Sequence, residues 1–176
     1  MHCRNLSLRA HMPLERLALL LSPFILPGFL GASDPQRFEA PVRYALGPVA
    51  EPVVFGDLDG DARPDVVIAN TAAGDEEGGG SVSVLLGTGA GPPVRGGDFP
   101  AGERPEWIAI GEFSNDGNLD VVAANYRGST VAALPGDGAG AFAAPVLTPS
   151  AGAPRSLAPF DANQDGALDL VTSNYD

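Results

Sequence analysis

Short apolar runs recur along the chain in a fixed order, separated by stretches rich in Gly, Pro, Asn and Asp. The runs are rich in Val and Ile, and such runs between turn-forming residues are typical of β-strands. No segment beyond residue 33 repeats apolar residues at the helical spacing over the length of a helix. The predicted strands are a first run at 52–55, 107–110 and 156–160, a second at 66–70, 121–125 and 170–174, and a third at 81–86 and 130–134.

The runs belong to a unit that repeats at about 50 residues, a period typical of propellers, solenoids and arrays. A Gly-rich turn at 87–91 or 136–140 follows the third run. Residues 38–42 resemble 142–146, and 98–101 is a weaker copy. Each unit is therefore predicted to hold about four short antiparallel strands, as a propeller blade does. The first strand is nearly all apolar, which predicts that it is buried on both faces.

Between the first and second runs of each unit lies a nine-residue acidic loop, called here loop one (57–65), loop two (112–120) and loop three (161–169). Positions 1, 3, 5 and 9 carry oxygen-bearing side chains, and position 7 shares only its backbone carbonyl. Calcium takes six to eight oxygen ligands in flexible geometry, so these loops predict calcium sites. The candidate ligands are Asp57, Asp59, Asp61, Arg63 and Asp65; Glu112, Ser114, Asp116, Asn118 and Asp120; and Asp161, Asn163, Asp165, Ala167 and Asp169.

The units resemble FG-GAP/VCBS repeats, the blades of integrin-alpha-like β-propellers. The motifs that carry the resemblance are Gly-Asp-Leu-Asp-Gly-Asp at 56–61 with Asp65, its two copies, and Val-Leu-Leu-Gly-Thr-Gly at 84–89. The resemblance implies an all-β fold, a partial β-propeller of about 2.5–3 four-stranded antiparallel blades that is a fragment of a larger, for example seven-bladed, propeller. It implies units at about 38–90, 91–141 and 142–176, the last one truncated.

Two other calcium motifs do not fit the loops. An EF-hand needs a Glu at position 12 and flanking helices, whereas position 12 here is Ile68, Ala123 or Thr172. The glycine-rich nonapeptide of calcium β-helices is absent from the sequence. The remaining alternative is that the loops are solvated turns, which Asp and Asn also favour. Loop two, with Glu112 and Ser114 at its first two ligand positions, is expected to bind calcium more weakly than loop one.

The formal net charge of −12 and the absence of lysine argue against nucleic acid as a partner. Residues 1–33 have the order of an export signal: arginines, an apolar stretch at 17–30, and small residues before Asp34. Met12 is an alternative start, and an uncleaved anchor is an alternative to cleavage. We expect a secreted, periplasmic or cell-surface protein. Cys3, His2 and His11 all lie in the signal, so the mature region of 34–176 would lack Cys and His.

Without His, a Ser–His or Cys–His triad and a His-ligated catalytic zinc are excluded from the mature region. We therefore predict a calcium-binding module for binding or adhesion, not an enzyme, with an unknown protein or carbohydrate ligand. The alternatives are a fragment of a polysaccharide lyase or hydrolase, and a carbohydrate-binding lectin. A Tyr/Arg/Glu site would draw on Tyr44, Tyr126, Tyr175, Arg127 and Arg155.

Three further features have plain structural interpretations. Trp107 is expected to pack within its blade, with a sugar-stacking platform as the alternative. Asn70, Asn125 and Asn174 recur at the end of the second run and are interpreted as turn residues. About two and a half blades would leave open strand edges, which predicts self-association as an alternative to truncation.

Overall fold

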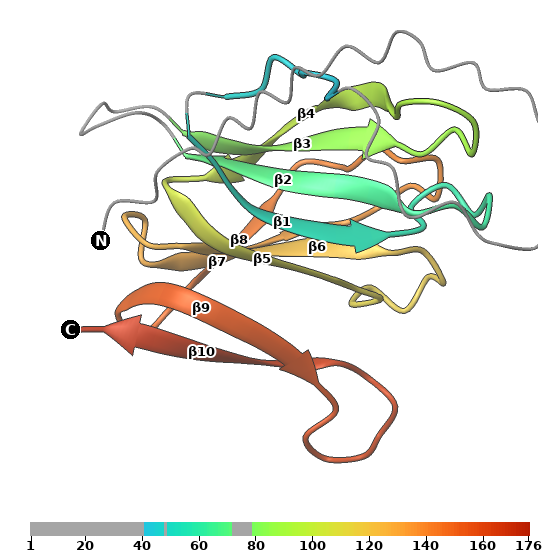
Figure 1. Ribbon diagram of the computed structural model, residues 1–176. Helices are drawn as coiled ribbons and strands as arrows, with labels where there is room; N and C mark the ends of the chain where they lie inside the picture. The colour runs from blue at the N-terminus through green and yellow to red at the C-terminus, as the bar shows by residue number, and fades with distance from the viewer. Residues whose placement is uncertain (1–40, 48, 72–78) are drawn as a thin grey trace, which may run out of the picture. The chain divides into compact units, whose positions relative to one another are not determined.

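The computed structural model describes residues 41–47, 49–71 and 79–176, and this part of the chain forms ten β-strands and no helix (Figure 1). The strands build three antiparallel sheets in the orders β1-β2-β3-β4, β5-β6-β7-β8 and β10-β9. Their bounds are β1 Val49–Gly56, β2 Asp65–Thr71, β3 Gly80–Leu86, β4 Val94–Gly102, β5 Pro105–Gly111, β6 Asp120–Asn125, β7 Thr130–Leu134, β8 Val146–Pro149, β9 Ala153–Phe160 and β10 Asp169–Tyr175. The all-β, propeller-like repeat is confirmed, and the sheets do not close into a ring.

The three acidic loops occupy the same place in each sheet. The first two strands of each sheet pair in antiparallel register up to the loop, with Gly56 opposite Asp65, Gly111 opposite Asp120 and Phe160 opposite Asp169. The last residue of each loop is thus the first residue of a strand. Position 9 is held by the sheet itself, whereas the earlier loop positions project beyond it.

The first and second sheets pack face to face on one hydrophobic core. Val67, Val82 and Val84 of the first sheet are fully buried in it, as are Val121 and Leu134 of the second. The outer parts of the two sheets meet through the rings of Phe99 and Phe142, whose centroids are 5.3 Å apart at 87°. Edge-to-face geometry of this kind adds to the stabilisation that burial provides.

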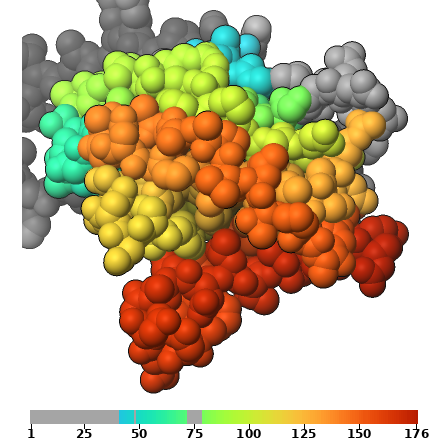
Figure 2. All heavy atoms as spheres, turned by 180° about the vertical axis from the view of Figure 1, so that it is seen from behind, coloured from blue at the N-terminus to red at the C-terminus, as the bar shows by residue number. Residues whose placement is uncertain are grey.

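A smaller core joins the second sheet to the third. Val122 and Ala124 of β6 pack with Leu157 of β9. Alternate residues of β6 therefore enter opposite cores, and all six residues of this strand are buried. The two strands of the third sheet, red in Figure 2, have a second face that no described residue covers, and six of the seven β10 residues are exposed.

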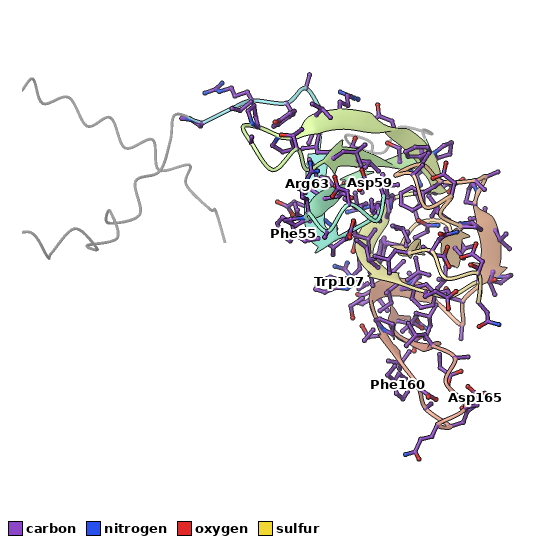
Figure 3. All side chains as sticks on the ribbon, turned by 90° about the vertical axis from the view of Figure 1, so that its right-hand side faces the viewer. Phe55, Asp59, Arg63, Trp107, Phe160 and Asp165 are labelled. Carbon is purple, nitrogen blue, oxygen red and sulfur yellow. The ribbon has the colours of Figure 1, made fainter. Side chains whose placement is uncertain are left out.

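The prediction that the first strand of each unit is buried on both faces is wrong. Val53 and Phe55 of β1, Trp107 of β5 and Phe160 of β9 are all exposed. Figure 3 shows Phe55, Trp107 and Phe160 on the same side of these first strands. In the two complete sheets the second strand has a neighbour on each edge and a core on one or both faces, whereas the first strand forms the edge of its sheet. Its apolar sequence alone does not reveal this position.

Residues 41–47 form no strand, although 38–42 resembles 142–146 and 98–101 in sequence. Of the two segments similar to 38–42, 98–101 lies in β4, whereas 142–145 contributes only the isolated bridge between Gly136 and Phe142. The segment 41–47 is instead attached to the first sheet by single hydrogen bonds, such as the one from the Tyr44 hydroxyl to the Pro93 carbonyl.

The predicted signal of 1–33, the alternative start at Met12, and Cys3, His2 and His11 lie outside the described residues. Within the described part of the chain, no helix has the length and apolar character needed to cross a membrane.

Candidate metal centre

The backbone of each acidic loop turns left-handed at positions 4 and 6. The φ values are 73° and 65° at Gly60 and Ala62, with the same pattern at Asn115 and Gly117 and at Gln164 and Gly166. Each loop has Gly at one of the two positions, because Gly adopts this conformation without a Cβ penalty. Asn is tolerated there as well, whereas Ala62 in loop one and Gln164 in loop three each carry a strain of about 1 kcal/mol.

This backbone turns N–H groups toward the carboxylates of the same loop. The position 5 amide donates to the position 1 side chain in all three loops, at 3.1 Å from Asp61 to Asp57. The position 7 amide donates to the position 5 carboxylate, at 2.9 Å from Arg63 to Asp61. The residue at position 7 thus donates its backbone N–H to the loop whether it is Arg63, Asn118 or Ala167. The side chains at positions 1 and 5 are held in place before any ion binds.

The aspartate at position 9 fastens the loop to the rest of its sheet. Asp65 is fully buried, and its two carboxylate oxygens accept hydrogen bonds from the amides of Leu58 (2.7 Å) and Gly87 (2.8 Å). Asp120 repeats this arrangement with the amides of Phe113 and Gly136, both at 2.8 Å. Glycine is needed at positions 87 and 136 because the backbone there passes close to the acidic loop.

A Cβ on Gly87 would lie 2.4 Å from the Pro64 carbonyl oxygen, and one on Gly136 would lie 2.1 Å from that of Leu119. In loop three, Asp169 is exposed and accepts one such bond, from Ala162 at 3.0 Å.

Loop one brings three carboxylates together. Asp57, Asp59 and Asp61 each offer an oxygen, and these oxygens lie within 4.8 Å of one another. Calcium–oxygen distances are 2.3–2.6 Å, so two ligands of one ion lie up to about 5 Å apart. The spacing and the all-oxygen donor set therefore fit one calcium ion, and the three side chains could hold a metal.

The crowding of these carboxylates is visible in the pKa of Asp59. Partial desolvation raises this pKa, and the negative charges of Asp61, Asp65 and Asp57 raise it further, against a hydrogen bond from the Asp61 amide. Mutual repulsion of this kind is relieved by a bound cation.

Loops two and three have one acidic side chain fewer at the exposed positions, since Ser114 and Asn163 occupy position 3. The Asn163 amide group donates to Asp165 at 2.9 Å. Backbone amides lower the pKa of Asp116 and of Asp165, from Asn118 and Ala167 respectively. Glu112 and Asp161 keep their place as acceptors for the position 5 amide. The described residues therefore form a three-carboxylate group in loop one, and the other two loops share its backbone frame.

Arg63 adds a positive charge at the edge of loop one. Its guanidinium lies 3.4 Å from the Asp61 carboxylate and donates to the Thr88 carbonyl at 3.0 Å. Figure 3 shows Arg63 beside Asp59 at this end of the first sheet, and Asp165 at the tip of loop three. Position 7 is uncharged in the other two loops.

A second group of polar side chains lies at the opposite ends of the strands. The guanidinium of Arg155 lies 4.6 Å from the ring centre of Tyr126 and 5.4 Å from that of Tyr175, and the guanidinium of Arg104 lies 5.2 Å from the Tyr126 ring. Both arginines pair with Glu106, at 3.0 Å for Arg104 and 3.7 Å for Arg155. The hydrogen bond with Tyr126, followed by the charge of Glu106, raises the pKa of Arg155.

The sequence predicts three of the five residues of this second group, Tyr126, Tyr175 and Arg155, and misses Arg104 and Glu106. Of the other two candidates, Tyr44 donates a hydrogen bond to Pro93 instead, and the contacts that define the group do not include Arg127. The register of β5 and β6 explains why Arg104 joins this group. Pro105 pairs with Asn125, so the preceding residue, Arg104, lies opposite Tyr126.

The interpretation of the repeated asparagines as turn residues is wrong, because Asn70, Asn125 and Asn174 all lie in strands. Asn70 and Asn125 are buried and donate across to the third strand, to Ser83 at 2.8 Å and to Thr130 at 3.2 Å.

A family model described as an FG-GAP-like repeat matches residues 57–123 and 112–172. The matched range begins at loop one, includes the whole second sheet and ends within β10. No curated protein and no solved structure matched the chain.

Proposed function

We propose that this chain, which belongs to the family of FG-GAP-like repeats, is a binding module whose blade loops are stabilised by calcium. The observation that carries the metal is the group of Asp57, Asp59 and Asp61, with oxygens within 4.8 Å of one another. FG-GAP-like repeats suggest a module for binding or adhesion. Calcium would then be structural, and the chain would act by binding a protein or carbohydrate and not by catalysis.

In loop one the ion would be held by Asp57, Asp59 and Asp61, with the carbonyl of Arg63 and the buried Asp65 completing the set. Loops two and three would use the matching residues: Glu112, Ser114, Asp116, Asn118 and Asp120; and Asp161, Asn163, Asp165, Ala167 and Asp169. The bound ion would offset the repulsion among the carboxylates and hold the loop in the form that its hydrogen bonds already favour.

We further propose that the protein works outside the cytoplasm, with 1–33 as its export signal. FG-GAP repeats are typically extracellular, and calcium sites as weak as 10⁻⁴–10⁻³ M are used in extracellular modules. A loop with partly exposed carboxylates suits such conditions.

Calcium is expected to raise the melting temperature. At calcium tenfold above Kd, one site adds about 1.4 kcal/mol to the free energy of unfolding, or about 4 °C for a chain of this size. The measurement is thermal unfolding by circular dichroism in calcium and in excess chelator. Asp61→Ala should lower the number of bound ions by one in calorimetric titration, whereas Asp137→Ala, outside the loops, should not. Equal melting with and without calcium would refute the proposal.

Replacing Arg63 by Ala is expected to tighten calcium binding to loop one. A guanidinium near the site repels the ion by on the order of 1 kcal/mol in a solvated environment, so Kd should fall about fivefold. Loop three already has Ala at this position, so the substitution is compatible with the loop backbone. Titration at low and high salt checks this, because the gain should shrink as ions screen the charge. An unchanged or weaker affinity at low salt would contradict it.

A further inference from the structure

The polar group opposite the acidic loops adjoins a cavity between the first and second sheets. This cavity has a volume of about 240 Å³. It lies where β1 and β5 begin and β2 ends, which is the end of the strands away from loops one and two. Its lining residues are Val49, Glu51, Thr71, Arg104, Pro105 and Glu106. Arg104 and Glu106 belong both to the cavity and to the group with Tyr126 and Arg155.

Several contacts hold this end of the sheets in a defined form. The carbonyl of Arg104 accepts a hydrogen bond from the Tyr126 amide at 3.0 Å, which ties the turn before β5 to the turn after β6. Arg104 itself has a left-handed backbone, with φ 56°. A non-glycine residue in this conformation is strained, and such residues are found at functional sites more often than elsewhere. Glu106 is only 18% exposed and fixes both guanidiniums.

The arginine side chains keep donors for a ligand. Each guanidinium has five N–H groups, of which the contact with Glu106 engages only some. The side chains of Arg104 and Arg155 are 48% and 54% exposed, and Tyr175 is 60% exposed. The site thus combines fixed donors, carboxylate acceptors and an exposed ring.

The charge balance selects the class of ligand. Glu51 and Glu106 offset Arg104 and Arg155, and the whole chain carries a net charge of −12, which disfavours polyanions. A neutral, hydroxyl-rich molecule needs donors and acceptors side by side, and sugar rings also pack on aromatic faces. The cavity is smaller than the 300–1,000 Å³ of drug-sized pockets, a size that suits one sugar ring.

We propose that the end of the sheets formed by Arg104, Glu106, Tyr126, Arg155 and Tyr175 binds a neutral sugar residue of a polysaccharide. Arg104 and Glu106, which face the cavity, hydrogen-bond the hydroxyls, and the tyrosines with Arg155 form the rim. This inference rests on the proposed function as a binding module and gives that module its ligand class and its contact residues.

Affinity electrophoresis of the full chain in calcium-containing gels tests the proposal. The probes are three neutral polysaccharides, galactan, mannan and β-glucan, with polygalacturonate as the acidic comparison. We expect at least one neutral polysaccharide to retard the protein. Arg104→Gln and Glu106→Gln should each weaken the apparent affinity about tenfold, because each removes a charged hydrogen-bonding group. Arg43→Gln removes an arginine charge elsewhere and should leave the retardation unchanged.

Thermal unfolding of the same variants separates binding from structure. If Arg104→Gln lowers the melting temperature while retardation stays as in the parent, the group only ties the sheets together and the proposal is overturned. No retardation by any neutral polysaccharide, or retardation by polygalacturonate alone, also overturns it. If the sugar site is overturned but calcium still raises the melting temperature, the proposed function stands. If calcium has no effect on the melting temperature, the proposed function fails as well.

Discussion

Replacing Asp120 by Ala is expected to destabilise the protein by about 2–6 kcal/mol, with calcium or without it. The carboxylate is 2% exposed and accepts hydrogen bonds from the amides of Phe113 and Gly136. Without it, two donors in a poorly solvated place lose their partner, at about 1–3 kcal/mol each. Urea unfolding in calcium and in chelator measures the loss.

Asp169→Ala is the matched control for this prediction. Asp169 has the same loop position but is exposed and accepts one backbone hydrogen bond, which water can replace. Its substitution should cost less than about 1 kcal/mol in chelator. Equal losses for the two variants would show that burial of the aspartate is not the cause. A loss for Asp120→Ala that appears only in calcium would show that this residue acts through the metal site alone and not through its hydrogen bonds to the two amides.

Replacing Gly136 by Ala is expected to destabilise the protein by about 3 kcal/mol. The added Cβ would lie 2.1 Å from the carbonyl oxygen of Leu119, and the next nearest atom is the carbonyl carbon at 3.1 Å. Backbone cannot yield as the end of a side chain can, so the turn must move away. That movement also lengthens the hydrogen bond from the Gly136 amide to Asp120.

Gly79→Ala provides the comparison at a glycine with space around it. A Cβ there would lie 3.9 Å from the Gly102 carbonyl oxygen, an ordinary contact. This variant should stay within about 0.5 kcal/mol of the parent in urea unfolding, as surface substitutions do. A similar loss for both variants would mean that close backbone approach is not what requires glycine at 136.

The glycine-rich turns and the position 9 aspartates were both visible in the sequence, but their connection was not. The sequence predicts turns at Gly87 and Gly136 and metal ligands at Asp65 and Asp120. The structure places each glycine amide on an aspartate oxygen across 22 or 16 residues. A contact between distant segments depends on how strands pair, and a local pattern does not contain that information.

Exposure of the first strands was missed for a related reason. The apolar composition of 52–55 and 107–110 favours strand formation, and it is compatible with either a central or an edge position. Phe55 is 67% exposed because β1 is the edge of its sheet and one of its faces has no described neighbour. The residue types of a segment predict that it forms a strand, but they do not predict which elements pack beside that strand.

The sequence by itself determined the strands, the period and the acidic loops, because alternating oxygens, turn residues and short Val-rich runs act over a few neighbouring residues. Only the tertiary structure decided that Asp65 is buried and bonded to the distant Gly87 amide, and that Arg104 and Glu106 meet Arg155 from another sheet. These outcomes depend on the register of paired strands and on the packing of one sheet against the next, which bring together residues that no local pattern connects.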